Sequence, residues 1–470
     1  MTRKLDLITH FDSVAEDSYK RAKRGSYLHK EFRKYLAFLI PPDSSVLHIG
    51  SGTGDLLASL KPTKGLGIDY SSKMVEVARQ KHPNLEFQVG DLDNLDIKMK
   101  YDYVLLVNVI GYADDIQNAF GQLKKVCRND TRVIVVYFNY LWEPILKVAE
   151  KIGIRMTRPT QHWLPPEDIE NIFNLCNFEV VRRTYRFLVP VYVPIVSMIF
   201  NKIIANLPGI RRLCLNHVVI ARFLEPKEMS EEVSCSIIIP CRNEKGNIEQ
   251  AGHRVPKMGR YNELIFVEGH STDGALEECY RVQKTYPEKD IKVLIQDGKG
   301  KGNAMLKGFA SACGDIFMIL DADLTVPPED LIKFFKAISS GKGEFINGSR
   351  LVYKMETQAM RSLNFAANKL FGIAFSYLLD QKIRDTLCGT KVLWKKDYEK
   401  IAANREYFGD FDPFGDFDLL FGAARLNLLI VEIPVKYGAR TYGTTSISRF
   451  KDGWLLIKMM IYAARKIKCS

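Results

Sequence analysis

The sequence predicts an α/β protein with two domains, each built around a mainly parallel β-sheet. Its 470 residues exceed what one hydrophobic core usually holds, whereas two domains of about 200 residues each are ordinary. Continuous apolar runs, typical of buried parallel strands, recur in both halves and end in glycines or acids. Residues 224–233 are acidic and lack periodicity, so they predict the linker between the domains.

The composition restricts both the class of protein and its partners. Hydrophobic residues make up 46% of the chain and charged residues 26%, values that exclude a disordered protein. The net charge of +12 favours anionic partners, namely phosphorylated ligands, acidic lipids or nucleic acid. Nine scattered cysteines argue against zinc and a disulfide framework, and indicate a cytoplasmic setting. No apolar stretch reaches the roughly 18 residues that a membrane-spanning helix needs.

Residues 1–44 mix aromatic and basic side chains at spacings that suit helices, and we interpret them as a basic helical cap. Such a cap closes over a ligand or touches a membrane. The alternative is an amphipathic helix that faces solvent.

The first firm strand, residues 46–49, runs into a turn that contains Gly50, Gly52 and Gly54. Glycines let the backbone approach a ligand, and the helix that follows offers free N–H groups. A second strand, residues 65–68, ends at Asp69, nineteen positions after Gly50. This spacing is typical of the acid that binds ribose hydroxyls in Rossmann-like nucleotide-binding units.

Two further strands, residues 86–89 and 103–107, lead to Asp91 and Asn108. Asp55 occupies the place of a dinucleotide fingerprint's third glycine, so NAD is less favoured. This order of motifs resembles class I S-adenosylmethionine-dependent methyltransferases over residues 45–223.

The resemblance implies S-adenosyl-L-methionine as cofactor and a role for each matching residue. The three glycines would face its methionine moiety, Asp69 its ribose and Asp91 its adenine, while Asn108 would lie near the sulfonium. His48 stands where the family usually has an acid.

Two features of this half remain open from the sequence. His162 lies in a loop near the expected methyl-transfer face, where it is either a general base or a structural histidine. The apolar insertion at residues 187–210 is flanked by Arg211 and Arg212, and it either lies in a bilayer interface or packs on the other domain.

The second half contains a buried strand, residues 316–320, that ends in the Asp-x-Asp motif of Asp321 and Asp323. Side chains alternate along a strand, so we expect both carboxylates on one face. Hard oxygen ligands suit Mg²⁺ or Mn²⁺, which in turn bind phosphate oxygens. The motif therefore predicts a divalent metal site.

Two upstream strands also end in acids. Residues 235–240 lead to Glu244, and residues 263–267 lead to Glu268 and Asp273. In an open α/β sheet, ligands bind at the carboxyl ends of the strands. These motifs together resemble glycosyltransferase family 2, of the GT-A fold, and its polyprenyl-phosphate sugar transferase branch.

This second resemblance covers residues 234–452 and implies a nucleotide-sugar site that holds the metal at Asp321 and Asp323. The residues that it implies around the donor are Pro240, Glu244, Glu268, Asp273, Lys301 and Asp321. Lys301 belongs to a Gly-Lys loop suited to a diphosphate. The resemblance also implies Asp418 as a carboxylate of the catalytic region, and Arg440 as part of a mobile basic loop.

The chain ends in a basic amphipathic segment, residues 453–470, which we interpret as an interfacial anchor or an oligomer contact. We expect peripheral association with the inner face of the membrane.

The sequence as a whole predicts a bifunctional enzyme: a methyltransferase and an inverting glycosyltransferase, with a polyprenyl-phosphate or glycan acceptor in polysaccharide or glycolipid biosynthesis. One alternative is a glycosyltransferase with a degenerate S-adenosylmethionine-binding scaffold domain, supported by His48. The other is a nucleic-acid methyltransferase; it would need a basic stripe near the site, and none is visible.

Overall fold

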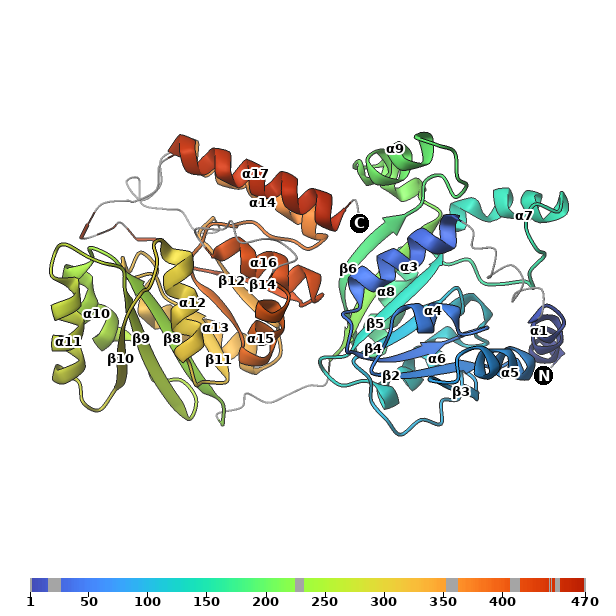
Figure 1. Cartoon of the computed structure of the whole chain (residues 1–470), viewed down its shortest axis with the longest axis horizontal. Coiled ribbons are helices and arrows are strands. Elements are labelled where there is room, and N and C mark those ends of the chain that lie inside the picture. The colour runs from blue at the N-terminus through green and yellow to red at the C-terminus, as the bar shows by residue number, and fades with distance from the viewer. Residues whose placement is uncertain are drawn as a thin grey trace. The chain divides into compact units, whose positions relative to one another are not determined.

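The computed structural model describes residues 2–15, 27–224, 232–351, 362–405, 415–438, 440, 442–443 and 449–468. The chain forms two compact units, residues 1–225 with 468–470 and residues 226–467 (Figure 1). Most of the predicted linker, residues 225–231, lies outside the described part, as do residues 444–448 of the predicted basic loop.

Unit 1 contains a seven-stranded sheet in the order β3-β2-β1-β4-β5-β7-β6. Its strands are β1 Ser45–Ile49, β2 Lys64–Asp69, β3 Glu86–Val89, β4 Tyr103–Val107, β5 Arg132–Phe138, β6 Phe178–Arg186 and β7 Asn216–Phe223. The first five strands pair in parallel, whereas β7 is antiparallel to both β5 and β6. Consequently β6 runs in the same direction as β5, and their carboxyl ends share one edge.

Eight helices of unit 1 fall in the described residues. They are α1 Thr2–Ser13, α3 Tyr27–Leu39, α4 Asp55–Ser59, α5 Ser72–Lys81, α6 Ile116–Gln122, α7 Glu143–Lys151, α8 Pro166–Leu175 and α9 Val196–Lys202. The four strands expected at residues 46–49, 65–68, 86–89 and 103–107 are all present. β4 and β5 were predictable because parallel strands that are buried on both faces are apolar throughout, whereas β3 is largely exposed.

The N-terminal residues form two helices that pack on unit 1. Leu7 of α1 is buried, as are Tyr35, Leu36 and Leu39 of α3. α3 therefore buries one apolar face, as an amphipathic helix does.

Unit 2 contains a second seven-stranded sheet, in the order β10-β9-β8-β11-β13-β12-β14. Its strands are β8 Ser234–Cys241, β9 Tyr261–Glu268, β10 Asp290–Ile295, β11 Ile316–Ile319, β12 Phe345–Ser349, β13 Lys391–Trp394 and β14 Ile430–Pro434. Strands β10, β9, β8 and β11 are parallel, and β13 is antiparallel to β11 and β12. Both units are therefore α/β, as predicted.

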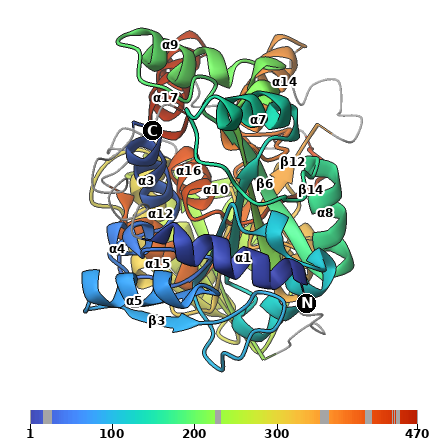
Figure 2. The same ribbon diagram turned by 90° about the vertical axis from the view of Figure 1, so that its right-hand side faces the viewer.

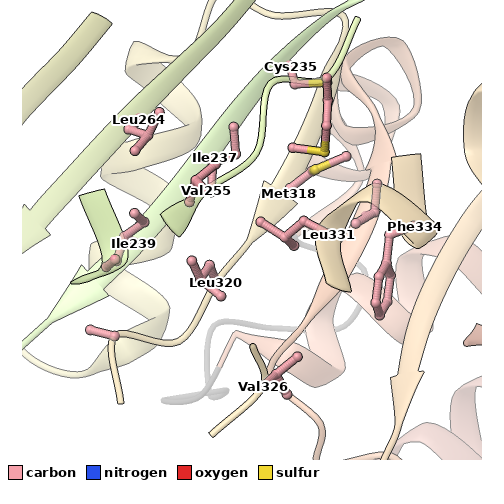
Figure 3. Close-up of a cluster of buried hydrophobic side chains, with 14 of the residues drawn as sticks. Cys235, Ile237, Ile239, Val255, Leu264, Met318, Leu320, Val326, Leu331 and Phe334 are labelled. Atoms are coloured by element: carbon pink, nitrogen blue, oxygen red, sulfur yellow. The ribbon is translucent and has the colours of Figure 1, made fainter. Parts of the chain in front are cut away.

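The helices described in unit 2 are α10 Lys245–Arg254, α11 Ala275–Thr285, α12 Lys301–Ser311, α13 Leu331–Ser339, α14 Ser362–Leu379, α15 Lys395–Ala403, α16 Asp416–Arg425 and α17 Arg449–Ile467. Figure 3 shows part of the core between this sheet and its helices. Ile237 and Ile239 of β8 and Met318 of β11 contribute apolar side chains to the cluster that contains Leu331 and Phe334 of α13. This core holds β8 and β11 side by side.

The C-terminal helix α17 begins at Arg449, four residues before the predicted start at 453. Its apolar face is largely buried at Leu456, Met459 and Ala463, and α17 packs beside α14. Trp454 and Ile461 are exposed. Among the described residues, none of the helices combines the length and the apolar character needed to cross a bilayer.

Candidate functional sites

In unit 1 the glycine turn lies where the strand order reverses. β1 is flanked by β2 on one side and β4 on the other, so the connections after β1 and β4 diverge and leave a crevice at their carboxyl ends. Gly50, Gly52 and Gly54 have φ values of 74°, 52° and 78°, a region that favours glycine. A Cβ atom on Gly52 would have no neighbour within 4 Å, so a ligand has room to approach this backbone.

Asp69 is the last residue of β2 and lies beside the glycine turn that follows β1. Its Oδ2 accepts a hydrogen bond from the N–H of Gly52 at 2.8 Å, and its Oδ1 accepts one from Ser71 at 3.0 Å. Burial raises the pKa of Asp69, although these two hydrogen bonds oppose the rise. The contacts fix the carboxylate beside the glycine turn.

Helix α1 lies over this edge of the sheet. Lys4 forms an ion pair with Asp91, which follows β3, and Asp12 accepts a hydrogen bond from the hydroxyl of Ser71 at 2.5 Å. The ring of Phe11 lies 5.6 Å from the rings of both Tyr70 and Tyr112. The cap predicted for the N-terminus therefore contacts two elements of the crevice.

A pocket beside the ends of β4 and β5 brings Asn108 and His162 together. Tyr137, Phe138 and Trp163 also line it. Asn108 Oδ1 and the hydroxyl of Tyr137 are buried without a hydrogen-bond partner among the described residues. Buried polar atoms normally have partners, so a polar ligand in this pocket would satisfy them.

His48 lies in the middle of β1 and is buried. Burial lowers its pKa to about 4, so the imidazole is neutral at pH 7. Neither ring nitrogen has a hydrogen-bond partner among the described residues. The position therefore carries no charge.

In unit 2 the strand order reverses between β8 and β11, and acids follow both strands. Arg440 joins them: its Nη1 lies 2.7 Å from Glu244 Oε1, and its Nη2 lies 2.7 Å from Asp323 Oδ2. Burial raises the pKa of Glu244 despite the favourable charge of Arg440. One guanidinium thus neutralises acids from both sides of the crevice.

Asp321 belongs to a second ionic cluster. Lys301, the first residue of α12, lies 2.7 Å from Asp321 Oδ1 and 3.7 Å from Asp416 Oδ2. Asp416 Oδ1 in turn lies 3.2 Å from Nζ of the fully buried Lys391. Burial alone would raise the pKa of Asp321, but the charge of Lys301 lowers it overall.

The two carboxylates of the Asp-x-Asp motif thus contact different cations. The strand β11 ends at Ile319, so Asp321 and Asp323 lie in a turn, and the alternation expected along a strand does not apply. Asp323 Oδ1 also accepts a hydrogen bond from the hydroxyl of Thr325 at 2.8 Å.

Gly389 fixes the position of Asp321 by its lack of a side chain. A Cβ atom at this position would lie 1.9 Å from Asp321 Oδ2. Nearby, Arg350 and Asp385 form a buried pair with two hydrogen bonds of 2.7 and 2.8 Å, and this pair lowers the pKa of Asp385 to about 2 although burial opposes it.

Asp418 does not join this cluster, unlike Asp416. Asp418 Oδ2 accepts a hydrogen bond of 2.7 Å from Arg405, and both residues line a small pocket between α15 and α16. Positions two apart on a helix face different directions, so only one of these acids can point at Lys301. The sequence favoured Asp418 over Asp416, because the start of α16 could not be predicted accurately enough to orient its first turn. Lys391 of β13 was not predicted as part of the site.

The remaining residues expected around the donor lie at the ends of β8 and β9. Glu268 accepts hydrogen bonds from the N–H groups of His270 and Ser271, at 3.1 and 2.5 Å. Asp273 accepts one from the N–H of Lys245 at 3.0 Å. Pro240 lies in β8 itself, paired with Val267 of β9.

A metal at this site would need oxygen ligands from Asp321 and Asp323, and the charge and chemistry of these side chains fit Mg²⁺ or Mn²⁺. Within the described residues, no cluster of three or more His, Cys, Asp or Glu side chains has the arrangement of a metal site. In this structure Lys301 and Arg440 supply the positive charge instead.

Comparison with known families finds one match in each half of the chain. Residues 46–130 match the family model for a methyltransferase domain, and residues 236–402 match the model for glycosyl transferase family 2. Both matches fall in the half for which the sequence predicted them. The chain therefore contains a segment that matches methyltransferase domains, followed by a segment that matches glycosyl transferase family 2.

Several curated proteins are similar to part of this chain. A dolichol-phosphate mannosyltransferase of Pyrococcus furiosus is 31% identical over 225 residues, which are 45% of this chain and 58% of that protein. A dolichyl-phosphate beta-glucosyltransferase of Saccharomyces cerevisiae is 26% identical over 238 residues, covering 46% of this chain and 70% of that protein. The chain spans between 41% and 58% of the length of three curated relatives that it matches.

Among solved structures, a SAM-dependent methyltransferase from Corynebacterium glutamicum aligns with 46% of this chain and 99% of its own. The sequence identity is 15% and the TM-score is 0.32.

Proposed function

We propose that unit 2 transfers a sugar from a nucleotide-sugar donor to a polyprenyl phosphate, and that unit 1 is an S-adenosylmethionine-dependent methyltransferase in the same glycolipid or surface-polysaccharide pathway. The observation that carries the first activity is the set of charges at the reversal of strand order, where Lys301 and Arg440 contact Asp321 and Asp323. Two cations at the carboxyl ends of parallel strands suit a diphosphate.

The transfer is a single displacement. An oxygen of the acceptor forms a bond to the anomeric carbon while the bond from that carbon to the diphosphate oxygen breaks, and the nucleotide diphosphate departs with the bonding electrons. Arg440 leaves its carboxylate partners to bind departing phosphate oxygens, and Lys301 holds the donor side of the site. A divalent ion held by Asp321 and Asp323 would add positive charge at the same place.

A lipid phosphate is the acceptor that does not require a general base from the protein. A sugar hydroxyl is a weak nucleophile near neutrality and needs a general base within about 3 Å. A phosphate monoester has a second pKa of about 6, so it is already ionised at pH 7. The relatives named for dolichol phosphate support this acceptor. A glycan hydroxyl is the alternative, with Asp416 or Asp418 as the base.

The test measures transfer from nucleotide sugars to polyprenyl phosphate in detergent. Asp323→Ala and Arg440→Ala should each lower the rate by about a hundredfold or more, because each removes charge that acts in the transition state. Asp418→Asn should lower it only modestly.

Asp416→Asn is compared with Asp418→Asn, since Asp416 is the acid that contacts Lys301. If the wild type forms no product on the lipid phosphate but transfers the sugar to a glycan, and either variant loses that transfer, the acceptor is a hydroxyl and the lipid-carrier proposal fails.

For unit 1, the residues of the crevice fit S-adenosylmethionine. Gly50, Gly52 and Gly54 would face its methionine moiety, and Asp69 its ribose, while Asn108 Oδ1 offers a buried acceptor without a partner among the described residues. The cofactor would supply an electrophilic methyl group. His162 lines the same pocket as Asn108 and would take a proton from the methyl acceptor.

His48 favours a second candidate for unit 1, a scaffold domain without activity. Titration calorimetry of the whole chain with S-adenosylmethionine and its demethylated product separates the two. If neither compound binds, the methyltransferase proposal is contradicted and the scaffold role is supported.

We include contact with the inner face of the membrane in this function, since a polyprenyl phosphate resides there. In unit 2, Leu370 and Ile373 on α14 are 69% and 62% exposed, and Trp454 on α17 is 59% exposed. These side chains and the net charge of +12 support a peripheral contact with anionic lipid.

A further inference from the structure

Unit 1 carries an exposed apolar surface that neither of its proposed ligands explains. Of the thirty large hydrophobic side chains that are exposed in the described residues, seventeen belong to residues 140–154 and 191–213. Exposed fractions reach 70% at Ile195 and 76% at Ile154. We call these two segments the apolar edge surface. Soluble proteins rarely expose so many apolar side chains together unless they bind something.

The two segments lie at one edge of unit 1. The first follows the carboxyl end of β5 and contains α7, and the second follows the carboxyl end of β6 and contains α9. Because β5 and β6 run in the same direction, both segments leave the sheet on the same side. Figure 1 and Figure 2 both show α7 and α9 at the upper end of this unit.

Specific contacts join the segments to each other. The indole N–H of Trp142 donates to the carbonyl oxygen of Leu213 at 2.8 Å, and Asn139 Nδ2 donates to the carbonyl oxygens of Arg212 and Cys214. Beneath them, Leu146 of α7 is buried with Phe187 and Leu215. The apolar edge surface is therefore supported by a small core of its own.

The charges around this surface are mainly positive. Residues 187–213 contain Lys202, Arg211 and Arg212 and no acid. On α7, Glu143 is paired with Lys147 at 2.5 Å, and Glu150 is paired with Arg155 at 2.7 Å. Exposed tyrosines, Tyr140 and Tyr192, stand among the aliphatic side chains.

We infer that the apolar edge surface docks unit 1 onto an anionic lipid bilayer, with its aliphatic side chains in the interfacial region and its cations against the headgroups. Apolar side chains with basic and aromatic neighbours are what an interfacial segment requires. A second copy of the chain is a poorer partner for this surface than a bilayer. Lysines are depleted at protein interfaces, and two copies would bring their positive charges against each other.

This docking deepens the peripheral contact included in the proposed function and gives unit 1 its own part in it. Phe138 and Trp163 line the pocket with Asn108 and His162, and both also pack against the small core beneath the apolar edge surface. The pocket thus lies next to the surface that meets the lipid. If the proposed methyl transfer holds, the methyl acceptor is an amphiphile carried by that bilayer.

The experiment measures flotation of the whole chain with vesicles of phosphatidylcholine alone or mixed with phosphatidylglycerol. The test variant combines Ile145→Gln, Val148→Gln, Ile195→Asn and Ile203→Asn. Asparagine is chosen at position 195 because this residue has a φ of 65°, which asparagine tolerates. The control variant carries Val89→Gln and Leu175→Gln, two exposed apolar side chains elsewhere on unit 1.

We expect the wild type and the control variant to float with the anionic vesicles, and the test variant to bind them at least about tenfold more weakly. Added salt should weaken binding of the wild type. A second measurement reports on unit 1 alone: fluorescence added by Met198→Trp should be quenched by brominated lipid, since Met198 is 56% exposed.

Equal flotation of the test variant and the wild type, without quenching at position 198, would overturn the inference. A change in oligomeric state instead of flotation would assign the surface to a second copy. Neither measurement requires S-adenosylmethionine or a nucleotide sugar, so failure here is distinguishable from failure of the proposed reactions.

Discussion

At the scale of single residues, Gly389 gives the sharpest test of the donor site. A side chain here would overlap the carboxylate of Asp321, which Lys301 holds in place. We expect Gly389→Ala to lower sugar transfer by about a hundredfold, because Asp321 must move away from its cation. The measurement is the transfer assay described above.

Gly438→Ala is the matched control, since its Cβ would lie 3.9 Å from its nearest neighbour, the carbonyl oxygen of Thr325. Wild-type activity in Gly389→Ala would mean that Asp321 is free to adopt another position.

A second prediction at this scale concerns pH. His48 has its pKa lowered from 6.5 to about 4 by burial, so between these values the unfolded chain binds a proton that the folded unit does not. The free energy of unfolding of unit 1 is therefore highest above pH 6.5, and it falls as the pH drops towards 4. The full difference corresponds to about 3 kcal/mol. Burial lowers the pKa of His217 to about 4 as well, in the same direction.

Thermal unfolding of unit 1 between pH 7 and pH 4.5 measures this dependence. His48→Leu should reduce the slope of the profile and leave the part due to His217, because leucine loses no hydrogen bond at position 48 and does not titrate. An unchanged profile would show that His48 takes up its proton without unfolding.

At the scale of elements, α1 is the helix whose role is easiest to isolate. It contacts Asp91, Ser71, Tyr70 and Tyr112 around the crevice of unit 1. We expect removal of residues 1–13 to weaken S-adenosylmethionine binding by on the order of tenfold, as loss of two or three such contacts does. Titration calorimetry measures the effect.

Phe11→Ala should reproduce part of this loss, whereas Leu5→Ala should not, since Leu5 is 63% exposed. Equal affinity with and without α1 would make the helix purely structural.

Elements also explain how far the sequence could lead. Strands such as β1 and β11 were predictable, because a parallel strand buried on both faces is apolar throughout its length. The turn at Gly50, Gly52 and Gly54 was also predictable, because glycine adopts positive φ values more readily than other residues. The orientation of Asp416 depends on where α16 begins, and helix ends are the least predictable part of an element. The pairing of Arg440 with Glu244 joins residues 196 positions apart, which local pattern cannot reveal.

The insertion at residues 187–210 shows the same limit. Its apolar periodicity suggested a helix, but α9 spans only Val196–Lys202, and the rest is mostly 3-10 and irregular structure. The prolines at 190, 194 and 208 interrupt the helix. The contribution of α7 to the same exposed surface could not be predicted from the sequence, because only the order of strands in the sheet brings β5 and β6 to one edge.

At the scale of the whole molecule, the two candidate sites are each built within one unit. We therefore expect Asp69→Ala to abolish S-adenosylmethionine binding while leaving sugar transfer measurable. Asp323→Ala should do the reverse. Calorimetry and the transfer assay, performed on the same preparations of the whole chain, check both statements. A loss of both activities in either variant would indicate that the units depend on each other.

The bridge made by Arg440 has a thermodynamic consequence for how the donor site fills. A divalent cation held by Asp321 and Asp323 would compete with the guanidinium of Arg440 for the carboxylate of Asp323, and this competition would lower its affinity when no donor is bound. Phosphate groups that attract Arg440 remove this competitor. Cation and donor should consequently bind with positive cooperativity, and linkage requires that each strengthens the other by the same factor. The concentration of donor needed to fill the site would then fall as the concentration of the cation rises.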